Sequence, residues 1–412
     1  MTISRRNFLG LTAAGVLLPK RLMALSPEEA AKRKFLFVYC RGGWDTTYCF
    51  APEFQNSLID MESDATTAEE GGITFVDHES RPSVRDFFER FGASTAVING
   101  IEVRSIAHEK AQQLVFTGAA SPGYDDWPTI IAYHGSSDLQ LPHVNVSGPT
   151  YSANYPESVV RLGSAGQLSV LMSGSGISEG TIPVSLPSSS VQSLEDQFVL
   201  ARANAGHRGF DRSYTSVLNH LNEFTTIASD IELAGASNLQ ERIDTVLDCF
   251  ELGLSRCGIV QYDGHQELGW DTHGGNEIQG WHYEELFGAL SEAMDSLEQR
   301  LGPTGQALSE EVCVVVFSEM GRHPKLNSHH GKDHWTFTSA MLCGAGVAGG
   351  RVIGGYDEQF YGKPVDLESC DLYADGSRLS DKHLGATLLA LAGVDWQEYA
   401  GGMSPLSGII RP

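Results

Sequence analysis

The chain has 412 residues, with 28 Lys and Arg against 52 Asp and Glu, which gives a formal net charge of −24. A charge this negative repels a phosphate backbone, so it excludes a general nucleic-acid binder. Hydrophobic residues at 41% and charged residues at 19% indicate a folded globular protein rather than a disordered one. No apolar run reaches the roughly 18 residues that cross a bilayer, so the sequence predicts no transmembrane span in the mature chain.

The first 25 residues have the pattern of an export signal. Residues 4–9 (SRRNFL) place Arg5 and Arg6 before a short apolar stretch that ends at Pro19. This order is typical of the twin-arginine signal, whereas an ordinary basic N-terminal helix is the alternative interpretation. We therefore predict a signal peptide over residues 1–25, recognition by the twin-arginine translocase and a periplasmic location. Cleavage after Ala24 and an uncleaved anchor both stay open.

Seven cysteines give an odd number and no C-x-x-C pair, so neither a zinc ribbon nor a thioredoxin motif is supported. Two close pairs could form disulfides after export, namely Cys40 with Cys49 and Cys249 with Cys257. The spacing alone does not decide between bridged and free thiols.

Apolar runs alternate with helical patterns along the chain. Continuous apolar runs predict buried strands at 35–40, 95–98, 258–262, 312–317 and 339–346. Apolar residues at helical spacing predict helices at 214–231, 239–250, 280–301 and 381–392. A Ser-, Gly- and Pro-rich stretch at about 172–190 predicts a surface loop. This alternation predicts an α/β fold with an open, mostly parallel sheet, in which ligands gather at the carboxyl ends of the strands.

Polar clusters stand beside four of the predicted strands. Their candidate residues are Asp45 after strand 35–40, Asp271 and His273 after 258–262, Glu319 and Arg322 after 312–317, and His334 before the next strand. Asp, Glu and His flanked by glycines are what a divalent metal ion needs. Any one of these residues alone is more often a surface carboxylate or a core histidine. Four clusters at four strand ends favour a shared site.

Three motifs in these clusters resemble a known family. The motifs are GWDTHG at 269–274, SEMGRHP at 318–324 and GKDHW at 331–335. Together with the twin-arginine start they resemble an uncharacterised bacterial family, domain of unknown function 1501, itself considered a relative of the alkaline phosphatase and sulfatase superfamily. The motif set is specific for the family and much less specific for an activity. The resemblance implies a single alkaline phosphatase-like domain over residues 33–412, built as a three-layer α/β/α sandwich.

The resemblance also implies a metal site. The residues that match metal-binding positions of the superfamily are Asp45, Asp271, His273, Glu319 and His334. The spacing of Asp271 and His273 is one residue rather than three. Two further departures are Met320, which stands where a histidine is expected, and His108, which stands where the nucleophile is expected. One ion held by Asp271, His273 and His334 is therefore the expected arrangement. The ligand types favour zinc, with calcium or manganese as alternatives.

The superfamily nucleophile is a Thr, Ser or modified Cys, and its position falls on His108, where no hydroxyl or thiol stands. His108 could be a metal ligand, a general base or a nucleophile, and Ser105, one helical turn earlier, could substitute for it. Arg322 and Lys332 could bind an anionic sulfate or phosphate group, or be solvated charges on a loop.

Two functions from different classes follow. The first is an exported metal-dependent hydrolase of phosphate or sulfate esters, acting on a small-molecule or polymeric anionic ester substrate. The second is a non-catalytic exported metal-binding or envelope-associated binding protein that retains the fold. The candidate ligand set favours the first function, and the missing hydroxyl nucleophile favours the second.

Overall fold

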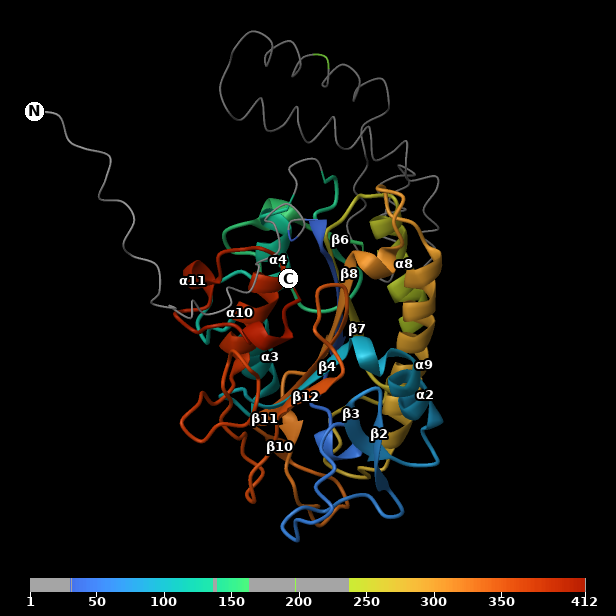
Figure 1. Cartoon of the computed structure of the whole chain (residues 1–412), viewed down its shortest axis with the longest axis vertical. Coiled ribbons are helices and arrows are strands. Elements are labelled where there is room, and N and C mark those ends of the chain that lie inside the picture. Colours follow the sequence, from blue (N-terminus) through green and yellow to red (C-terminus); the bar gives the residue numbers. More distant parts are fainter. Residues whose placement is uncertain (1–29, 31, 136–138, 163–196, 198–236, 412) are drawn as a thin grey trace, which may run out of the picture.

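The computed structural model describes residue 30 and the ranges 32–135, 139–162 and 237–411, together with residue 197 (Figure 1). The predicted signal peptide at 1–25, the Ser/Gly-rich loop at 172–190 and the predicted helix at 214–231 lie outside these residues.

Within the described residues, an eight-stranded sheet runs through the centre in the order β12-β4-β11-β8-β1-β7-β5-β6. Its strands are β1 (Lys34–Cys40), β4 (Thr95–Glu102), β5 (His143–Asn145), β6 (Val159–Arg161), β7 (Cys257–Tyr262), β8 (Val312–Phe317), β11 (Phe337–Gly344) and β12 (Arg351–Gly354). The strand β11 pairs antiparallel with both of its neighbours, and the other pairs in this sheet are parallel. The mostly parallel sheet that the sequence predicts is confirmed.

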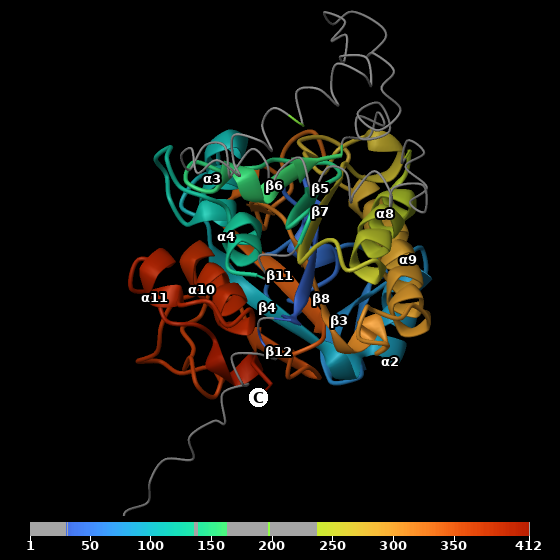
Figure 2. The same ribbon diagram turned by 90° about the horizontal axis from the view of Figure 1, so that it is seen from above.

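Helices cover both faces of the sheet (Figure 2). One layer holds α3 (His108–Thr117), α4 (Trp127–Tyr133), α10 (Asp381–Leu391) and α11 (Trp396–Tyr399). The other layer holds α2 (Pro82–Phe91), α8 (Leu239–Glu251) and α9 (Ile278–Gln299). The result is a three-layer α/β/α arrangement. Among the described residues, no helix combines the length and the hydrophobicity that crossing a bilayer requires.

Short elements complete the described part of the chain. Two small antiparallel sheets pair β2 (Thr66–Glu70) with β3 (Ile73–Asp77) and β9 (Gly321–Arg322) with β10 (His334–Trp335). The 3-10 helices are Thr46–Tyr48, Gly92–Ser94, Pro156–Ser158, His265–Glu267, Leu308–Glu310 and Ser407–Ile409.

Both faces of the central strands are buried, which explains their unbroken apolar sequences. In β1, Leu36 and Val38 pack in the core with residues of α8 and α9. Phe35 and Phe37 point to the opposite face and pack with residues of α4 and α10. Since successive side chains of a strand alternate between faces, a strand covered on both sides is apolar at every position.

Polar residues interrupt the apolar run of β4, so the sequence predicts a strand that is too short. The strand continues four residues past the predicted end at 98, because the buried Asn99 finds partners inside the protein. Its amide donates to the Phe50 carbonyl at 2.9 Å, and its side-chain oxygen accepts from Ser339 at 2.6 Å. A buried amide whose nitrogen and oxygen both have hydrogen-bond partners does not end a strand.

All seven cysteines are buried and free in the structure. Cys40 and Cys49 are not bridged, and neither are Cys249 and Cys257. Burial raises the pKa of the Cys49 and Cys257 thiols well above the ordinary value, so these thiols stay protonated and unreactive at neutral pH.

The direction of β11 decides which loops meet at one edge of the sheet. The strands β1, β4, β7 and β8 all end at this edge, since they run parallel to one another. Because β11 runs the other way, it begins where they end, with Phe337 lying opposite Glu102 of β4. The segment before β11 therefore joins the segments that follow the parallel strands.

Candidate metal centre

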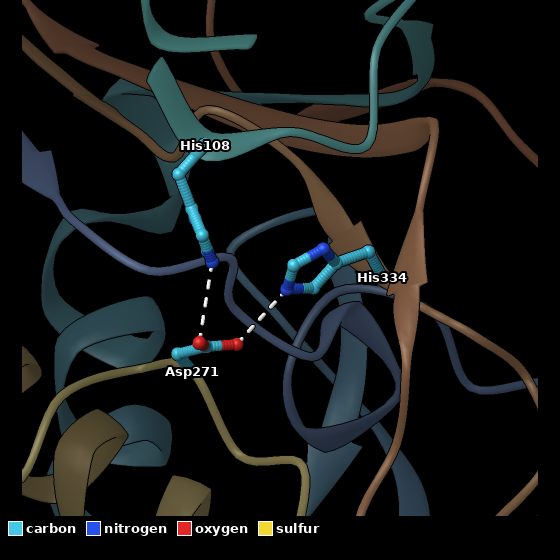
Figure 3. Close-up of side chains that lie close together, drawn as sticks. All are labelled: His108, Asp271 and His334. Atoms are coloured by element: carbon cyan, nitrogen blue, oxygen red, sulfur yellow. Dashed lines mark hydrogen bonds and ion pairs between the residues drawn. The ribbon is translucent and has the colours of Figure 1, made fainter. Parts of the chain in front are cut away.

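Three side chains from distant parts of the chain meet at this edge of the sheet (Figure 3). His108 is the first residue of α3, Asp271 lies in the loop after β7, and His334 opens β10. One ligand atom from each of these residues lies within 4.8 Å of the other two. These three residues have the chemistry and the spacing of a metal-binding group.

Asp271 is the central residue of the group. Its Oδ2 lies 3.2 Å from His108 Nε2, and its Oδ1 lies 3.0 Å from His334 Nε2. His273 adds a further nitrogen, with Nε2 at 3.2 Å from Asp271 Oδ1 and 3.0 Å from His334 Nε2. Ligand atoms about 2.0–2.1 Å from a tetrahedral zinc ion lie roughly 3.3 Å apart, so these separations are of the right size. Asp271, His273 and His334 therefore lie within contact distance of one another, and their sharing of one ion stays a prediction.

The outer nitrogen of each histidine is held by an acceptor. His334 Nδ1 donates to the Ile106 carbonyl at 2.6 Å, His273 Nδ1 lies 3.0 Å from Asp333 Oδ1, and His108 Nδ1 lies 2.8 Å from Glu319 Oε1. Carbonyl and carboxylate oxygens accept but do not donate, so each Nδ1 carries the hydrogen. In the neutral imidazoles, each Nε2 then turns a lone pair toward Asp271. Metal-binding histidines commonly have this arrangement.

The Asp271 carboxylate and the Nε2 lone pairs that face it are all acceptors, so a positive charge is required between them. His108 Nε2 is buried and, within the described part of the chain, makes no well-formed hydrogen bond. The nearby Asp271 and Glu319 carboxylates raise the pKa of His108 to about 9, so a proton supplies this charge when no ion is bound. Burial alone would raise the pKa of Asp271, but the contacts of its carboxylate with His108, His334 and the Arg322 guanidinium outweigh it and hold that pKa well below its usual range. The donors fit a divalent ion that accepts nitrogen and oxygen ligands, such as zinc.

Glu319 supports His108 rather than facing Asp271. Its carboxylate is wholly buried and accepts from the Gly42 amide at 2.9 Å as well as from His108. A buried carboxylate behind a histidine fixes the orientation of the ring and raises its basicity. Direct binding of metal by Glu319 therefore stays a prediction, and the contact that the structure gives is with His108. The neighbouring Met320 packs in a small apolar cluster with residues of α3.

Asp45 lies in a separate buried network. Its Oδ1 accepts from the amide and the hydroxyl of Thr47, and its Oδ2 accepts from Asn276 at 2.7 Å. The Lys332 ammonium lies 2.8 Å from the same Oδ2. Asp45 and Lys332 are both buried, so each neutralises the charge of the other. Metal binding by Asp45 and anion binding by Lys332 stay predictions, since each residue is occupied by the other in the structure.

Arg322 positions Asp271. The wholly buried guanidinium donates to Asp271 Oδ1 at 2.7 Å, to the Gly43 carbonyl at 2.7 Å and to the Lys332 carbonyl at 3.1 Å. The planar fork of arginine suits several acceptors at fixed angles. The predicted role of Arg322 toward an anionic substrate group is untested, and its contacts in the structure are to the protein.

Ser105 stands three residues before α3 begins. Its hydroxyl accepts from the Ala107 amide at 3.2 Å, which shapes the turn into the helix. The helix starts at His108, so it is His108 that is presented to Asp271 and Glu319. A role for Ser105 as nucleophile stays a prediction.

The loop that carries Asp271 is fixed from α9. His282 accepts from the His265 amide through Nδ1 at 2.8 Å, and its Nε2 donates to the Gly269 carbonyl at 2.9 Å. Burial lowers the pKa of His282 to about 4, so the ring is neutral at pH 7 and can accept at one nitrogen while donating at the other. Gln279 donates to the Trp270 carbonyl at 2.9 Å, next to Asp271. Pattern reading did not assign either residue to the site, because both look like ordinary helix positions.

Two further contacts were missed from the sequence. Asp333 orients His273, and the carbonyl of Ile106 orients His334. Asp333 is adjacent to His334 in the GKDHW motif, so the motif offered a signal for it. A backbone carbonyl has no sequence signal at all, since every residue carries one.

Comparison with known proteins gives a partial match to a family. Residues 255–401, about a third of the chain, match the family described as "Protein of unknown function (DUF1501)". The motifs at 269–274, 318–324 and 331–335 lie inside the matched region, so the resemblance is confirmed there. No curated protein matches the sequence significantly.

Several solved structures are similar to the chain at low identity. A 2-O GAG sulfatase has 8% identity and a TM-score of 0.42, and the match covers 92% of this chain and 75% of that one. The zinc complex of the C-terminal periplasmic domain of EcEptC from Escherichia coli has 8% identity and a TM-score of 0.40, with 89% and 84% covered. A protein in the alkaline phosphatase superfamily from Vibrio parahaemolyticus has 9% identity and a TM-score of 0.36, with 88% and 67% covered. At these scores the similarities carry no argument about activity.

The buried pair of Asp45 and Lys332 yields a stability prediction. Lys332→Met leaves the buried carboxylate without a counter-charge, so the free energy of unfolding should fall by about 3–5 kcal/mol. Urea denaturation followed by circular dichroism measures this loss. The matched control is Asp45→Asn with Lys332→Met, which removes both charges and should recover more than half of the loss. A single variant as stable as the wild type would contradict the pairing.

Proposed function

We propose that the chain is a metal-dependent hydrolase of phosphate or sulfate esters. The observation that carries the proposal is the convergence of three imidazole Nε2 atoms on the Asp271 carboxylate at the carboxyl edge of the sheet. Asp271 and His273 have side chains that are 44% and 48% exposed, so the group is open to a ligand from solvent. Catalytic metal sites keep an open position in this way, whereas structural sites are closed.

The residues of the site have two roles: some bind the metal ion, and His108 transfers a proton beside it. Asp271, His273 and His334 hold the ion, and Arg322 keeps Asp271 in place. When bound, a divalent ion would polarise the ester and lower the pKa of a water molecule. His108 holds or moves a proton at Nε2, and the buried Glu319 stabilises the charged ring. A role for His108 as a fourth ligand is the alternative, and the metal content of a His108 variant separates the two roles.

The assignment to phosphate or sulfate esters depends on the sequence motifs and not on the geometry of the site. Metal sites of this composition serve many reactions, so the geometry supports metal chemistry without selecting a substrate. The motifs resemble the DUF1501 family, itself considered a relative of the alkaline phosphatase and sulfatase superfamily, and this relation supports phosphate or sulfate esters, small or polymeric.

A second candidate function is metal-dependent binding at the cell envelope without catalysis. The specific observation in its favour is that α3 starts with His108 and presents no hydroxyl to Asp271. Arg322 and Lys332, the two cations assigned to an anionic substrate, are also buried and paired within the protein. Both functions need the same ion, and turnover distinguishes them.

The metal proposal predicts one equivalent of divalent ion in the purified wild type, measured by elemental analysis. The double variant His273→Ala with His334→Ala should bind less than about a tenth of that amount, because it removes two of the three ligands. Added zinc should raise the melting temperature of the wild type alone, since an ion at 100 times its Kd stabilises by about 2.7 kcal/mol.

His329→Ala is the matched control, because His329 is an exposed histidine in the same loop region and should leave the metal content unchanged. A wild type without stoichiometric metal, or a double variant that keeps it, would refute the metal centre.

The hydrolase proposal predicts turnover of at least one ester among an aryl phosphate, an aryl phosphodiester and an aryl sulfate. His108→Ala should lower kcat by about 100-fold or more, because it removes the proton-transfer group, whereas Ser105→Ala should keep turnover within about threefold. Steady-state assays with metal-loaded protein measure both effects. Loss of turnover only in the serine variant would move the nucleophile to Ser105. A metal-loaded wild type that turns over none of the three esters would favour the binding function.

We also propose export by the twin-arginine translocase, on the pattern at residues 4–9. Replacing both Arg5 and Arg6 by lysine keeps the charge but removes the paired arginine, so the protein should accumulate in the cytoplasm. Cell fractionation followed by immunoblotting measures the distribution. The control exchanges the order of Lys20 and Arg21, which lie after the apolar stretch, and should leave export unchanged. Normal periplasmic yield of the variant that lacks the paired arginine would contradict this route.

A further inference from the structure

A cavity of about 590 Å³ lies between α3, α10 and α11. The α3 residues that line it are Lys110, Leu114 and Thr117, which lie on the face of the helix opposite His108, given about 100° of rotation per residue. Helix α10 packs against both α3 and α11, and the three labels lie together in Figure 1. The cavity is therefore separate from the metal centre, although both use α3.

The lining of this cavity is cationic in an otherwise acidic chain. Arg104, Lys110 and Lys382 line it, against one acidic residue, Glu398. Within the described part of the chain, neither lysine makes an ion pair: Lys110 Nζ donates to the Ala120 carbonyl and to Gln113. Positive side chains that share one cavity repel one another, and an anion between them relieves this repulsion. The excess of positive charge thus favours an anionic ligand.

Arg104 is tied to the wall of the cavity. Its Nη2 lies 3.4 Å from Oδ1 of Asp381, a wholly buried carboxylate, while about half of the arginine side chain is exposed. Asp381 Oδ2 has no hydrogen-bond partner among the described residues. The contact with Asp381 offsets part of the charge of Arg104 and fixes its position.

Two glycines make room for Lys382. A Cβ at Gly118 would lie 3.0 Å from Lys382 Cγ, and a Cβ at Gly401 would lie 2.9 Å from Lys382 Nζ. Both glycines have positive φ, 66° and 60°, which side chains disfavour. Lys382 also stands in the first turn of α10, where the helix dipole adds positive potential. The fold thus gives its ammonium a defined place at the cavity wall.

We propose that this cavity is an anion-binding site that takes a sulfate or phosphate group through Arg104, Lys110 and Lys382. The group is either carried on a larger ligand, for which the exposed ring of Tyr124 at the lining gives an apolar face, or is a free inorganic oxyanion. The site is independent of the hydrolase proposal, since it includes none of the metal-binding residues.

Isothermal titration of the full chain with inorganic sulfate and inorganic phosphate, in EDTA, tests the site. Lys382→Ala should raise the Kd by about tenfold, because it removes one charge-assisted contact. Lys363→Ala is the matched control, an exposed lysine outside this cavity, and should change the Kd by less than about twofold. A Lys382→Ala variant that binds like the wild type, with an unchanged melting temperature, would overturn the proposal. Equal weakening in the two variants would overturn it as well, since it would report net charge alone.

Two further titrations identify the source of the anion and distinguish this site from the metal centre. Glucose 6-sulfate or glucose 6-phosphate binding about tenfold more tightly than the inorganic ion supports a group carried on a ligand, and equal or weaker binding supports a free oxyanion. The double variant His273→Ala with His334→Ala should bind the anion like the wild type, even if the metal proposal fails. Binding that is lost in this double variant and kept in Lys382→Ala would place the anion at the metal centre and refute the site at α3.

Discussion

The positive charge that Asp271 requires is the constraint on which the candidate site depends. One carboxylate faces Nε2 of three histidines and the guanidinium of Arg322, all within 3.2 Å. The outer nitrogens of the histidines are already committed to oxygen acceptors, so the inner ones are left to bind a proton or an ion. A group with this many acceptors around one point is stable only with a cation, and proton and metal compete for it.

The surrounding side chains explain how this group is held in place. Arg322 is wholly buried, and its contacts join Asp271 to the backbone at Gly43 and Lys332. Glu319 does the same for His108 through the Gly42 amide. Buried charges are tolerated only when they are paired and hydrogen-bonded, which holds for both residues. Asp271 and His108 are thus oriented by side chains that the solvent does not reach.

The candidate metal centre and the cavity at α3 also differ in how their positive charges are distributed. The cations nearest in sequence to the candidate metal ligands, Arg322 and Lys332, are paired inside the protein. The cations that face open space are on the other side of α3, at Lys110 and Lys382. In a chain with a net charge of −24, an exposed cationic cavity draws anions locally against the overall field. The proposed anion site therefore uses Lys110 and Lys382 rather than Arg322.

The sequence by itself determined the long central strands and pointed to most residues of the candidate site. Apolar runs at 35–40 and 312–317 predict β1 and β8 closely, because a strand buried on both faces has to be apolar throughout. The rule that polar residues gather at strand ends pointed to Asp271, His273 and His334, whose side chains lie close together in the structure. Short strands such as β5 and β12 escaped prediction, since three or four residues carry too little pattern.

Only the tertiary structure decided what each polar residue contacts. The antiparallel direction of β11 places His334 at the shared edge of the sheet. An apolar run predicts a buried strand, but it does not predict the direction of that strand. Asp45 and Glu319 have the same chemistry in the sequence as Asp271, yet Asp45 is paired with Lys332 and Glu319 with His108. Residue type sets which partners a side chain can accept, whereas the packing of distant segments sets which partner lies within 3 Å. A carboxylate can therefore be named from sequence, but its role follows from its neighbours in the fold.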